Sequence, residues 1–305
     1  MTVPRKSPLP RRRLLTATAA ATGVAALPAW TAPPRPVGGG LEVLALLDAE
    51  GPFPRPARPT FPGATEADWA RARRLDPAAF GPDDAWLLAF RCFAVRRPGG
   101  RVTIVDTGVG PANSPAAPWA PVPGRLPEVL ESAGIDVHDV EAVVLTHLHE
   151  DHYGWAVLPG GEPLFPDARH LVQRTELAAL ADGDPAQSYV VEPLRRAGQL
   201  HAVEGRHQLR GRGGRLTLLP TPGHTPGHQS VLVEGGRRDV VITGDALVHA
   251  VQLAAPDVAY APERDKEQAR ASRRELFATA RERHALLATS HLNQPFTEAS
   301  WGPDA

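Results

Sequence analysis

Four potential metal ligands fall within six residues near the middle of the chain, in the sequence THLHEDH: His147, His149, Asp151 and His152. If this segment continues a strand, the alternate residues His147 and His149 point to the same side. Asp151 and His152 follow at a turn and can face a neighbouring point. Neutral imidazole and carboxylate groups suit zinc and similar divalent cations. Packing alone does not explain such a cluster, so the segment predicts a metal site.

Three further candidate ligands stand next to tight turns or directly after apolar runs. His224 lies in the glycine- and proline-rich sequence TPGHTPGH, Asp245 follows VVITG, and His291 follows LLATS. Taken singly, each of the three could be an ordinary turn or capping residue. Together with the first cluster they supply seven ligands, which is enough for two metal ions that share one carboxylate.

Apolar runs typical of strands precede these residues, and helical patterns alternate with the runs. We expect strands over residues 41–47, 86–96, 101–106, 142–145, 170–172, 216–219, 230–233, 240–243 and 285–289, and helices over 65–74, 126–133, 174–180 and 262–284. This order favours sheets with helices packed on their outer sides. The proline-rich stretch 48–84 contains only one expected helix, and so long a loop is usually a lid or a binding segment.

The ordered set of motifs resembles the metallo-β-lactamase-fold hydrolase superfamily, over residues 41–292. The resemblance implies an α/β fold of the α+β kind, an αββα sandwich with its metals at one edge of the two sheets. It assigns the ligands as follows: His147, His149 and His224 to a first metal, Asp151, His152 and His291 to a second, and Asp245 as the bridge between them.

Two residues beside these ligands receive supporting roles. Asp106, in the sequence VDTG, matches an earlier motif of the superfamily, and we expect it to orient a ligand histidine. The alternative is that Asp106 is an ordinary turn residue at a strand end. His228, four residues after His224, is expected to be structural and not a ligand.

Departures from individual branches of the superfamily narrow the function that the resemblance implies. The metallo-β-lactamases themselves lack the bridging aspartate, and flavodiiron-type proteins have a glutamate where His149 stands. Glyoxalase II-like enzymes add a helical region after the fold, but only 14 residues follow His291. What remains resembles the branch that contains N-acyl homoserine lactonases and methyl parathion hydrolase-like enzymes. This resemblance rests on the proline-rich segment before the first expected hairpin, on residues 146–155 and on the sequence GDALVH at 244–249. The implied substrate is therefore a lactone first, or a carboxylic ester or phosphotriester.

The implied mechanism uses two divalent ions, with zinc expected. Coordination lowers the pKa of water by many units, so a hydroxide bridging the two ions could attack a carbonyl or phosphoryl centre. Asp151 and Asp245 would be the catalytic carboxylates, with Asp151 passing a proton to the leaving group. Three alternatives stay open: a mononuclear iron enzyme similar to persulfide dioxygenases, a β-lactamase-like enzyme, and a non-catalytic zinc-binding protein.

Aromatic residues in the 48–84 stretch predict an apolar wall over the metals. Phe61 and Trp69 are the expected substrate-binding residues, because large apolar side chains in a long loop suit a binding cavity. The alternative is that these rings cover the outside of a sheet or form an oligomer contact.

The first residues resemble an export address. Residues 1–32 carry five basic residues and no acidic ones, and Arg11-Arg12-Arg13-Leu14-Leu15 resembles a twin-arginine signal. The apolar run that follows, 14–27, is too short to span a bilayer. We therefore expect an exported protein, periplasmic or extracellular, without stable membrane insertion: a signal over 1–32, a flexible lead-in over 33–40 and a single domain over 41–305.

Composition restricts the partners. Hydrophobic residues make up 42% of the 305-residue chain and charged residues 22%, which is typical of a globular protein. Without residues 1–32 the net charge is −6, so no nucleic-acid partner is expected. The single cysteine, Cys92, forbids an internal disulfide and is expected to be a small buried hydrophobic residue. The expected partner is a small-molecule substrate, and the oligomeric state stays open.

Overall fold

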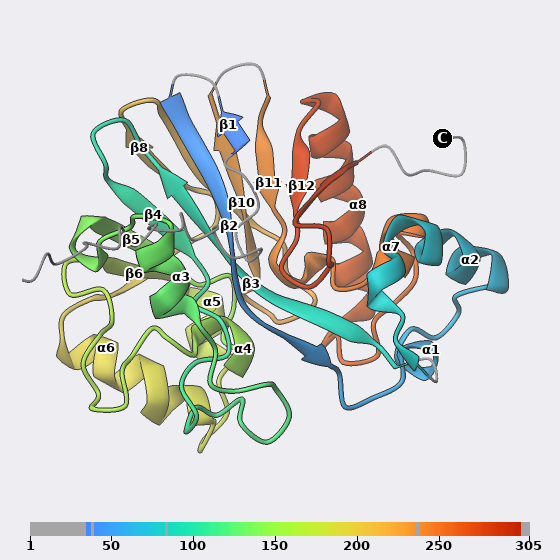
Figure 1. Cartoon of the computed structure of the whole chain (residues 1–305), viewed down its shortest axis with the longest axis horizontal. Helices are drawn as coiled ribbons and strands as arrows, with labels where there is room; N and C mark the ends of the chain where they lie inside the picture. The colour runs from blue at the N-terminus through green and yellow to red at the C-terminus, as the bar shows by residue number, and fades with distance from the viewer. Residues whose placement is uncertain (1–34, 38–39, 83–84, 236–237, 300–305) are drawn as a thin grey trace, which may run out of the picture.

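Two β-sheets face each other and helices lie on both outer sides (Figure 1). This computed structural model describes residues 35–37, 40–82, 85–235 and 238–299, without the side chains of 35–37. The predicted export signal lies outside the described residues. Part of the predicted lead-in, Arg35–Val37, forms a short strand that pairs with the strand beginning at Leu41.

The first sheet has the strand order β1-β2-β3-β4-β5-β6-β7. Its strands are β1 (Arg35–Val37), β2 (Leu41–Pro52), β3 (Leu87–Arg96), β4 (Val102–Val105), β5 (Val140–Val144), β6 (Arg169–Gln173) and β7 (Leu200–Val203). Neighbours from β1 to β4 pair antiparallel, whereas β4 to β7 pair parallel. The sheet is therefore mixed.

The second sheet has the order β13-β12-β11-β10-β9-β8. Its strands are β8 (His207–Gly211), β9 (Gly214–Pro220), β10 (Gln229–Glu234), β11 (Val240–Ile242), β12 (Leu286–Ala288) and β13 (Phe296–Glu298). Among the strands described for this sheet, only β11 and β12 pair parallel. Their carboxyl ends therefore meet at one edge, which is where Asp245 and His291 follow in the chain.

The helices form the outer layers. They are α1 (Ala57–Thr60), α2 (Glu66–Leu75), α3 (Leu126–Ser132), α4 (Glu150–Tyr153), α5 (Arg174–Ala178), α6 (Glu192–Arg196), α7 (Ala250–Ala254) and α8 (Lys266–Glu282). Helices α3 and α6 pack on the first sheet, and α8 packs on the second (Figure 1). This arrangement confirms the predicted αββα sandwich. In the described ranges, no helix combines the length and the apolar composition that crossing a bilayer requires.

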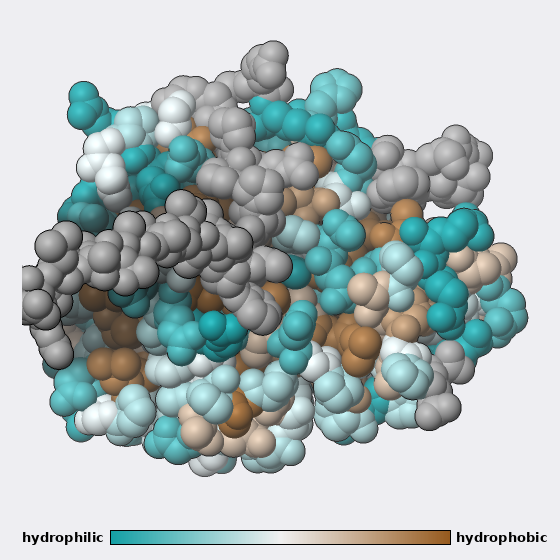
Figure 2. Space-filling model, viewed as in Figure 1, coloured by the Kyte–Doolittle hydropathy of each residue, from teal (hydrophilic) through white to brown (hydrophobic). Residues whose placement is uncertain are grey.

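Apolar side chains fill three layers of core. On β5, Val144 lies in the core between the sheets, whereas Val143 faces the helices, because successive strand residues point to opposite sides. Both faces of the strand are thus buried, which explains its continuous apolar sequence. Cys92 is fully buried in the helix-facing core, as expected. Where Figure 2 shows described residues, hydrophilic and apolar areas alternate on the face in view.

Several element boundaries differ from the prediction. Strand β2 continues to Pro52 instead of ending at Leu47, because it pairs with the first half of β3 beyond an irregularity at Asp48. Helix α8 begins at Lys266 and not at residue 262, because the Asp265 side chain accepts the N–H of Gln268 and caps the helix there. Strands β7, β8 and β13 were not expected, and β8 has mostly exposed, polar residues that give no apolar signal.

Candidate metal centre

The fold brings all seven candidate ligands to one edge of the sandwich, although four separate segments supply them. The first segment follows β5 and continues into α4, the second joins β9 to β10, and the others follow β11 and β12. Three groups have ligand atoms within 4.8 Å of one another: His147, His149 and His224; His147, His152 and Asp245; and Asp151, His152 and His291. Six of the seven residues are buried, and His149 is partly buried.

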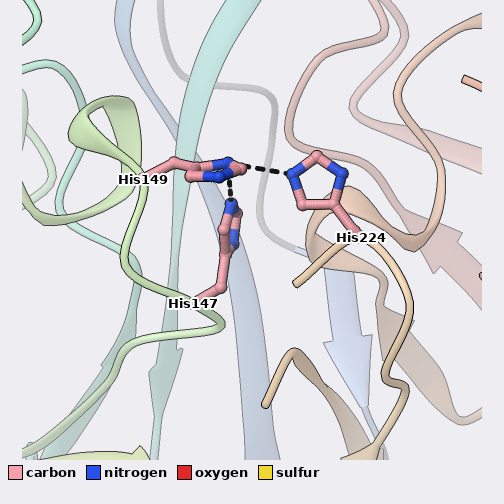
Figure 3. Close-up of side chains that lie close together, drawn as sticks. All are labelled: His147, His149 and His224. Carbon is pink, nitrogen blue, oxygen red and sulfur yellow. Dashed lines mark hydrogen bonds between the residues drawn. The ribbon is translucent and has the colours of Figure 1, made fainter. Parts of the chain in front are cut away.

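The first group consists of three histidines whose ring nitrogens converge (Figure 3). The Nδ1 of His149 lies 2.9 Å from the Nε2 of His147 and 3.0 Å from the Nε2 of His224. One ring nitrogen carries a single proton or a single lone pair, so it cannot satisfy two such partners at full strength. Three nitrogens around one point are instead a suitable ligand set for a cation.

Asp245 faces both groups of ligands. Its Oδ1 lies 3.0 Å from the Nε2 of His291 and 3.2 Å from the Nε2 of His152. Its Oδ2 lies 3.3 Å from the Nε2 of His224, which belongs to the three-histidine group. Asp151 lies on the other side of His152 and His291, with Oδ2 at 3.4 and 3.5 Å from their Nε2 atoms. Asp245 is thus placed to bridge two cations.

Hydrogen bonds on Nδ1 aim the Nε2 atoms of three histidines into the site. His152 donates from Nδ1 to Oδ2 of Asp106 at 2.9 Å, and His291 donates to the carbonyl of Ala89 at 2.9 Å. His147 donates to the hydroxyl of Thr146 at 3.0 Å, and that hydroxyl donates in turn to Asp106 at 2.9 Å. A proton held on Nδ1 leaves the Nε2 lone pair free for a cation.

The pKa values show how the charges are distributed. Burial, helped by neighbouring imidazoles, lowers the pKa of His147 and of His224 well below the ordinary value, so both rings are neutral. Burial also opposes protonation of His152, but the carboxylates of Asp151, Asp245 and Asp106 outweigh it and raise the pKa of this ring. The same negative field would attract a divalent cation.

Two buried atoms in the site show that it fits metal ions. The Nε2 of His152 and the Oδ1 of Asp245 are buried and have no well-aligned hydrogen-bond partner. Leaving a buried polar atom without a partner costs about 1–3 kcal/mol. A divalent cation between the two atoms would satisfy both, and the set of imidazoles and carboxylates suits zinc and its neighbours.

The turn that carries Asp245 is held by His228. The Nε2 of His228 accepts the backbone N–H of Asp245 at 2.9 Å, while its Nδ1 donates to the carbonyl of Thr221 at 3.1 Å. Burial lowers the pKa of His228 to about 4, so the ring stays neutral and keeps this pattern. Gly244, with φ of 51°, leaves room for the contact, because a Cβ there would lie 2.7 Å from the His228 Nε2. His228 is therefore structural.

Buried arginines anchor two of the ligand segments. Arg91 on β3 donates to the carbonyls of Thr289 and Leu292, on either side of His291, at 3.1 and 2.5 Å. Arg273 on α8 donates to the carbonyl of Ala246, next to Asp245, at 3.1 Å. Sequence reasoning missed both. A lone arginine inside the apolar run LLAFRCFAV was the signal that could have found Arg91.

A cavity of about 340 Å³ opens onto the candidate ligands. Its walls are formed by the side chains Phe53, Pro54, Trp86, Leu88, Trp119, Val248, Tyr260 and Pro262, with Arg55 and Glu150 among the polar lining residues. The Tyr260 ring stacks on the imidazole of His224, with an angle of 11° between the planes. The cavity therefore combines aromatic walls with a metal-binding floor, and a small organic molecule fits such a space.

Phe61 and Trp69 do not line this cavity, which corrects the sequence expectation. Their exposed fractions are 1% and 5%, and they pack behind the wall. The Phe61 ring lies 5.3 Å from Trp86 and 5.2 Å from Tyr260, and Trp69 packs on Phe61 at 6.2 Å. The 48–84 stretch does reach the cavity, but through Phe53, Pro54 and Arg55. Burial, which depends on tertiary packing, was not visible in the sequence.

The fold and the arrangement of these ligands define a known class of metalloprotein. Residues 91–291 match the model of the metallo-beta-lactamase superfamily, and the chain belongs to that superfamily.

Three curated relatives of this chain are named N-acyl homoserine lactonases. An N-acyl homoserine lactonase AttM of Rhizobium radiobacter is 31% identical over 173 residues, which cover 50% of this chain and 63% of that protein. The AttM of Azorhizobium caulinodans is 35% identical over 161 residues, covering 46% and 58%. N-acyl homoserine lactonase AiiA of Bacillus thuringiensis subsp. kurstaki is 31% identical over 123 residues, covering 40% and 44%. The chain thus spans less than two thirds of the length of each.

Solved structures share the fold across most of the chain. Hydrolase AbOPH of the beta lactamase superfamily superposes with a TM-score of 0.71 at 21% identity, covering 87% of this chain and 91% of that one. AidC, a dizinc quorum-quenching lactonase in complex with the product N-hexanoyl-L-homoserine, superposes with a TM-score of 0.68 at 21% identity, covering 87% and 92%. At these identities the likeness establishes the architecture alone.

Proposed function

We propose that the protein is a metal-dependent hydrolase that binds two divalent cations and opens a lactone or cleaves a similar ester bond. The observation that carries the proposal is the position of Asp245, whose two oxygens face the three-histidine group and the group of Asp151, His152 and His291. One carboxylate between two ligand sets is the arrangement expected of a two-ion site. Zinc is the proposed ion, because imidazole and carboxylate ligands suit it.

Similarity to other proteins supports a lactone as the first substrate to test. The curated relatives are named N-acyl homoserine lactonases, and AidC is a dizinc lactonase seen with a homoserine product. The cavity supplies aromatic walls against which an acyl chain or an aryl group can pack. Aryl esters and phosphotriesters fit the same chemistry and belong to the same test.

The side chains around the cavity have separate tasks in this proposal. Bound divalent cations would supply Lewis acidity toward a carbonyl or phosphoryl oxygen and would acidify a water molecule. Burial raises the pKa of Tyr260, so its hydroxyl keeps its proton and can donate a hydrogen bond to the substrate. Asp151 lines the cavity, and although burial opposes ionisation, His152 and His291 lower its pKa. The ionised Asp151 would accept the proton of the attacking water and pass it to the leaving oxygen.

The second ligand group argues against a one-iron enzyme. A mononuclear reading gives Asp151 and His152 no metal to hold, yet both are buried, and His152 is aimed into the site by Asp106. Burying ionisable groups without partners costs free energy, so a second ion explains the second group better.

A hydrolysis screen tests the proposed function. Metal-loaded protein is given acyl homoserine lactones, aryl esters, paraoxon-type triesters and a cephalosporin, and the expected result is turnover of a lactone or ester that stops on chelation and returns with zinc. No turnover of any substrate, with two ions bound per chain, would favour a non-catalytic zinc-binding protein.

A further inference from the structure

Glu176 on α5 joins two segments that supply metal ligands. Its Oε1 accepts the backbone N–H of Leu148 at 2.9 Å, and its Oε2 accepts the backbone N–H of Gly227 at 2.9 Å. Leu148 stands between His147 and His149, and Gly227 stands three residues after His224. One carboxylate therefore connects both segments that form the three-histidine group.

The fit around Glu176 is close on both sides. A Cβ on Gly227 would lie 2.1 Å from the backbone nitrogen of Glu176, so only glycine lets this segment approach α5. Glu176 itself is 4% exposed, and water cannot readily replace its oxygens as acceptors. Because α5 directly follows β6, the position of the carboxylate is fixed to the first sheet.

The other ligand group is held directly by different residues, although Asp106 also reaches His147 through the hydroxyl of Thr146. Asp106 orients His152, and Arg91 holds the segment of His291. Gln229 also links the two histidine segments, because its backbone N–H donates to the carbonyl of Thr146 and its Nε2 donates to the carbonyl of Leu145, both at 2.9 Å. Those bonds lie before His147, whereas Glu176 binds at Leu148, between two ligands of the three-histidine group.

We propose that Glu176 is a positioning residue that sets the distance between His224 and the His147–His149 pair, and so sets the cation affinity of the three-histidine group alone. The inference rests on the proposed two-ion site but does not depend on which substrate is cleaved. A small change in ligand separation matters because zinc–nitrogen bonds have a narrow range, near 2.0–2.1 Å.

Cobalt titration of the metal-free protein, followed by its visible absorption spectrum, tests the proposal. Glu176→Gln presents an amide N–H to one of the two backbone N–H groups, and Glu176→Ala removes both acceptors. Each variant is expected to bind one cobalt ion as the wild type does and the other about 10- to 100-fold more weakly, the range seen when a supporting partner of a ligand is lost. Glu234→Ala is the matched control, because Glu234 is also buried but binds Arg215, Thr217 and Arg283.

A double variant separates positioning from general loss of stability. His149→Ala disrupts the three-histidine group, and in that background Glu176→Gln should leave the affinity of the remaining ion unchanged. Equal weakening of both ions in Glu176→Gln, wild-type affinity for both, or the same selective loss in Glu234→Ala would overturn the proposal. These outcomes are read from metal binding, so absence of hydrolysis would contradict the proposed function and not this role of Glu176.

Discussion

Asp106 holds His152 through a hydrogen bond of 2.9 Å between Oδ2 and Nδ1, from a backbone position with φ of 60°. Its Oδ1 accepts the backbone N–H of Thr146 at 2.7 Å, so neither oxygen is free to move. The left-handed backbone of a non-glycine residue is strained, and Asp106 keeps it while making three hydrogen bonds in the core. The carboxylate thereby decides which nitrogen of His152 carries the proton.

Replacing that carboxylate by an amide should weaken one ion. In Asp106→Asn, an amide N–H facing Nδ1 would move the His152 proton to Nε2, where it blocks the cation. We expect about 10- to 100-fold weaker binding of one zinc ion, measured by competition with a chromophoric chelator. Asp136→Asn is the control, since Asp136 only caps a short turn remote from the ligands. Unchanged affinity for both ions would exclude the role of Asp106.

Asp245→Asn should lower both metal content and turnover by orders of magnitude. An amide nitrogen has no lone pair to offer a cation, and the neutral side chain leaves two cations with less compensating negative charge. The number of metal ions per chain, measured by plasma emission, is expected to fall below two. Asp239→Asn is the control: this carboxylate pairs with Arg283, and the variant should keep the wild-type metal content. Two retained ions with near-normal turnover would remove the bridging model.

Phe53 and Phe61 should give opposite results although both belong to the 48–84 stretch. Phe53→Ala removes part of the cavity wall and should raise the KM of long-chain substrates more than that of short ones. Each lost methylene contact is expected to cost up to roughly 0.8 kcal/mol of binding free energy. Phe61→Ala should instead lower the free energy of unfolding by about 3–5 kcal/mol, because Phe61 is a core residue. Equal KM changes for short and long substrates in Phe53→Ala would contradict a wall function.

Asp48 should make stability fall as the pH rises. Burial raises its pKa to about 6, against the N–H donors of Val109, Leu126 and Trp155. The folded state then binds a proton that the unfolded state releases near its ordinary pKa of about 4, so this residue's contribution is lost between about pH 4 and pH 6. The loss is about 3 kcal/mol, and Asp48→Asn should not show it.

Urea unfolding of the metal-free wild type and Asp48→Asn at several pH values measures this difference. The stability of the variant relative to the wild type should increase by about 2–3 kcal/mol from pH 4 to pH 7. A difference that stays constant across this range would show that Asp48 is ionised in the folded protein at pH 4.

We propose that the protein is exported by its paired arginines. Replacing Arg11, Arg12 and Arg13 by lysine keeps the charge but removes the guanidinium groups, and precursor should then accumulate inside the cell. Immunoblotting of cell fractions measures the result. Unchanged secretion would point to another export route or to no signal.

Most of the buried strands could be predicted because each rests on a local pattern, whereas the convergence of the ligands at one edge was implied by the resemblance to the metallo-β-lactamase superfamily. Apolar runs mark the buried strands, and ligands that directly follow such runs lie at strand ends by necessity. The THLHEDH segment needs no knowledge of the fold to indicate a cation site. Asp245 and His291 share an edge of the sandwich because β11 and β12, which they follow, pair parallel.

The supporting residues could not be predicted, because their roles depend on contacts between distant segments. Glu176 is an ordinary helix residue in the sequence and becomes a bridge only when β6 places α5 beside two loops. Phe61 and Phe53 look alike in sequence, yet one is buried behind Trp86 and the other lines the cavity. Local composition cannot separate a ring that faces the core from one that faces a ligand.

Metal analysis coupled to lactone hydrolysis tests the central claim most directly. Protein stripped by chelation is titrated with zinc while turnover of an acyl homoserine lactone is followed. Because the site has two groups of ligands, we expect activity to rise as zinc is added and to reach its maximum at two ions per chain. Saturation at a single iron with oxygen consumption, or full occupancy by two zinc ions without hydrolysis of any lactone, aryl ester or triester, would contradict it.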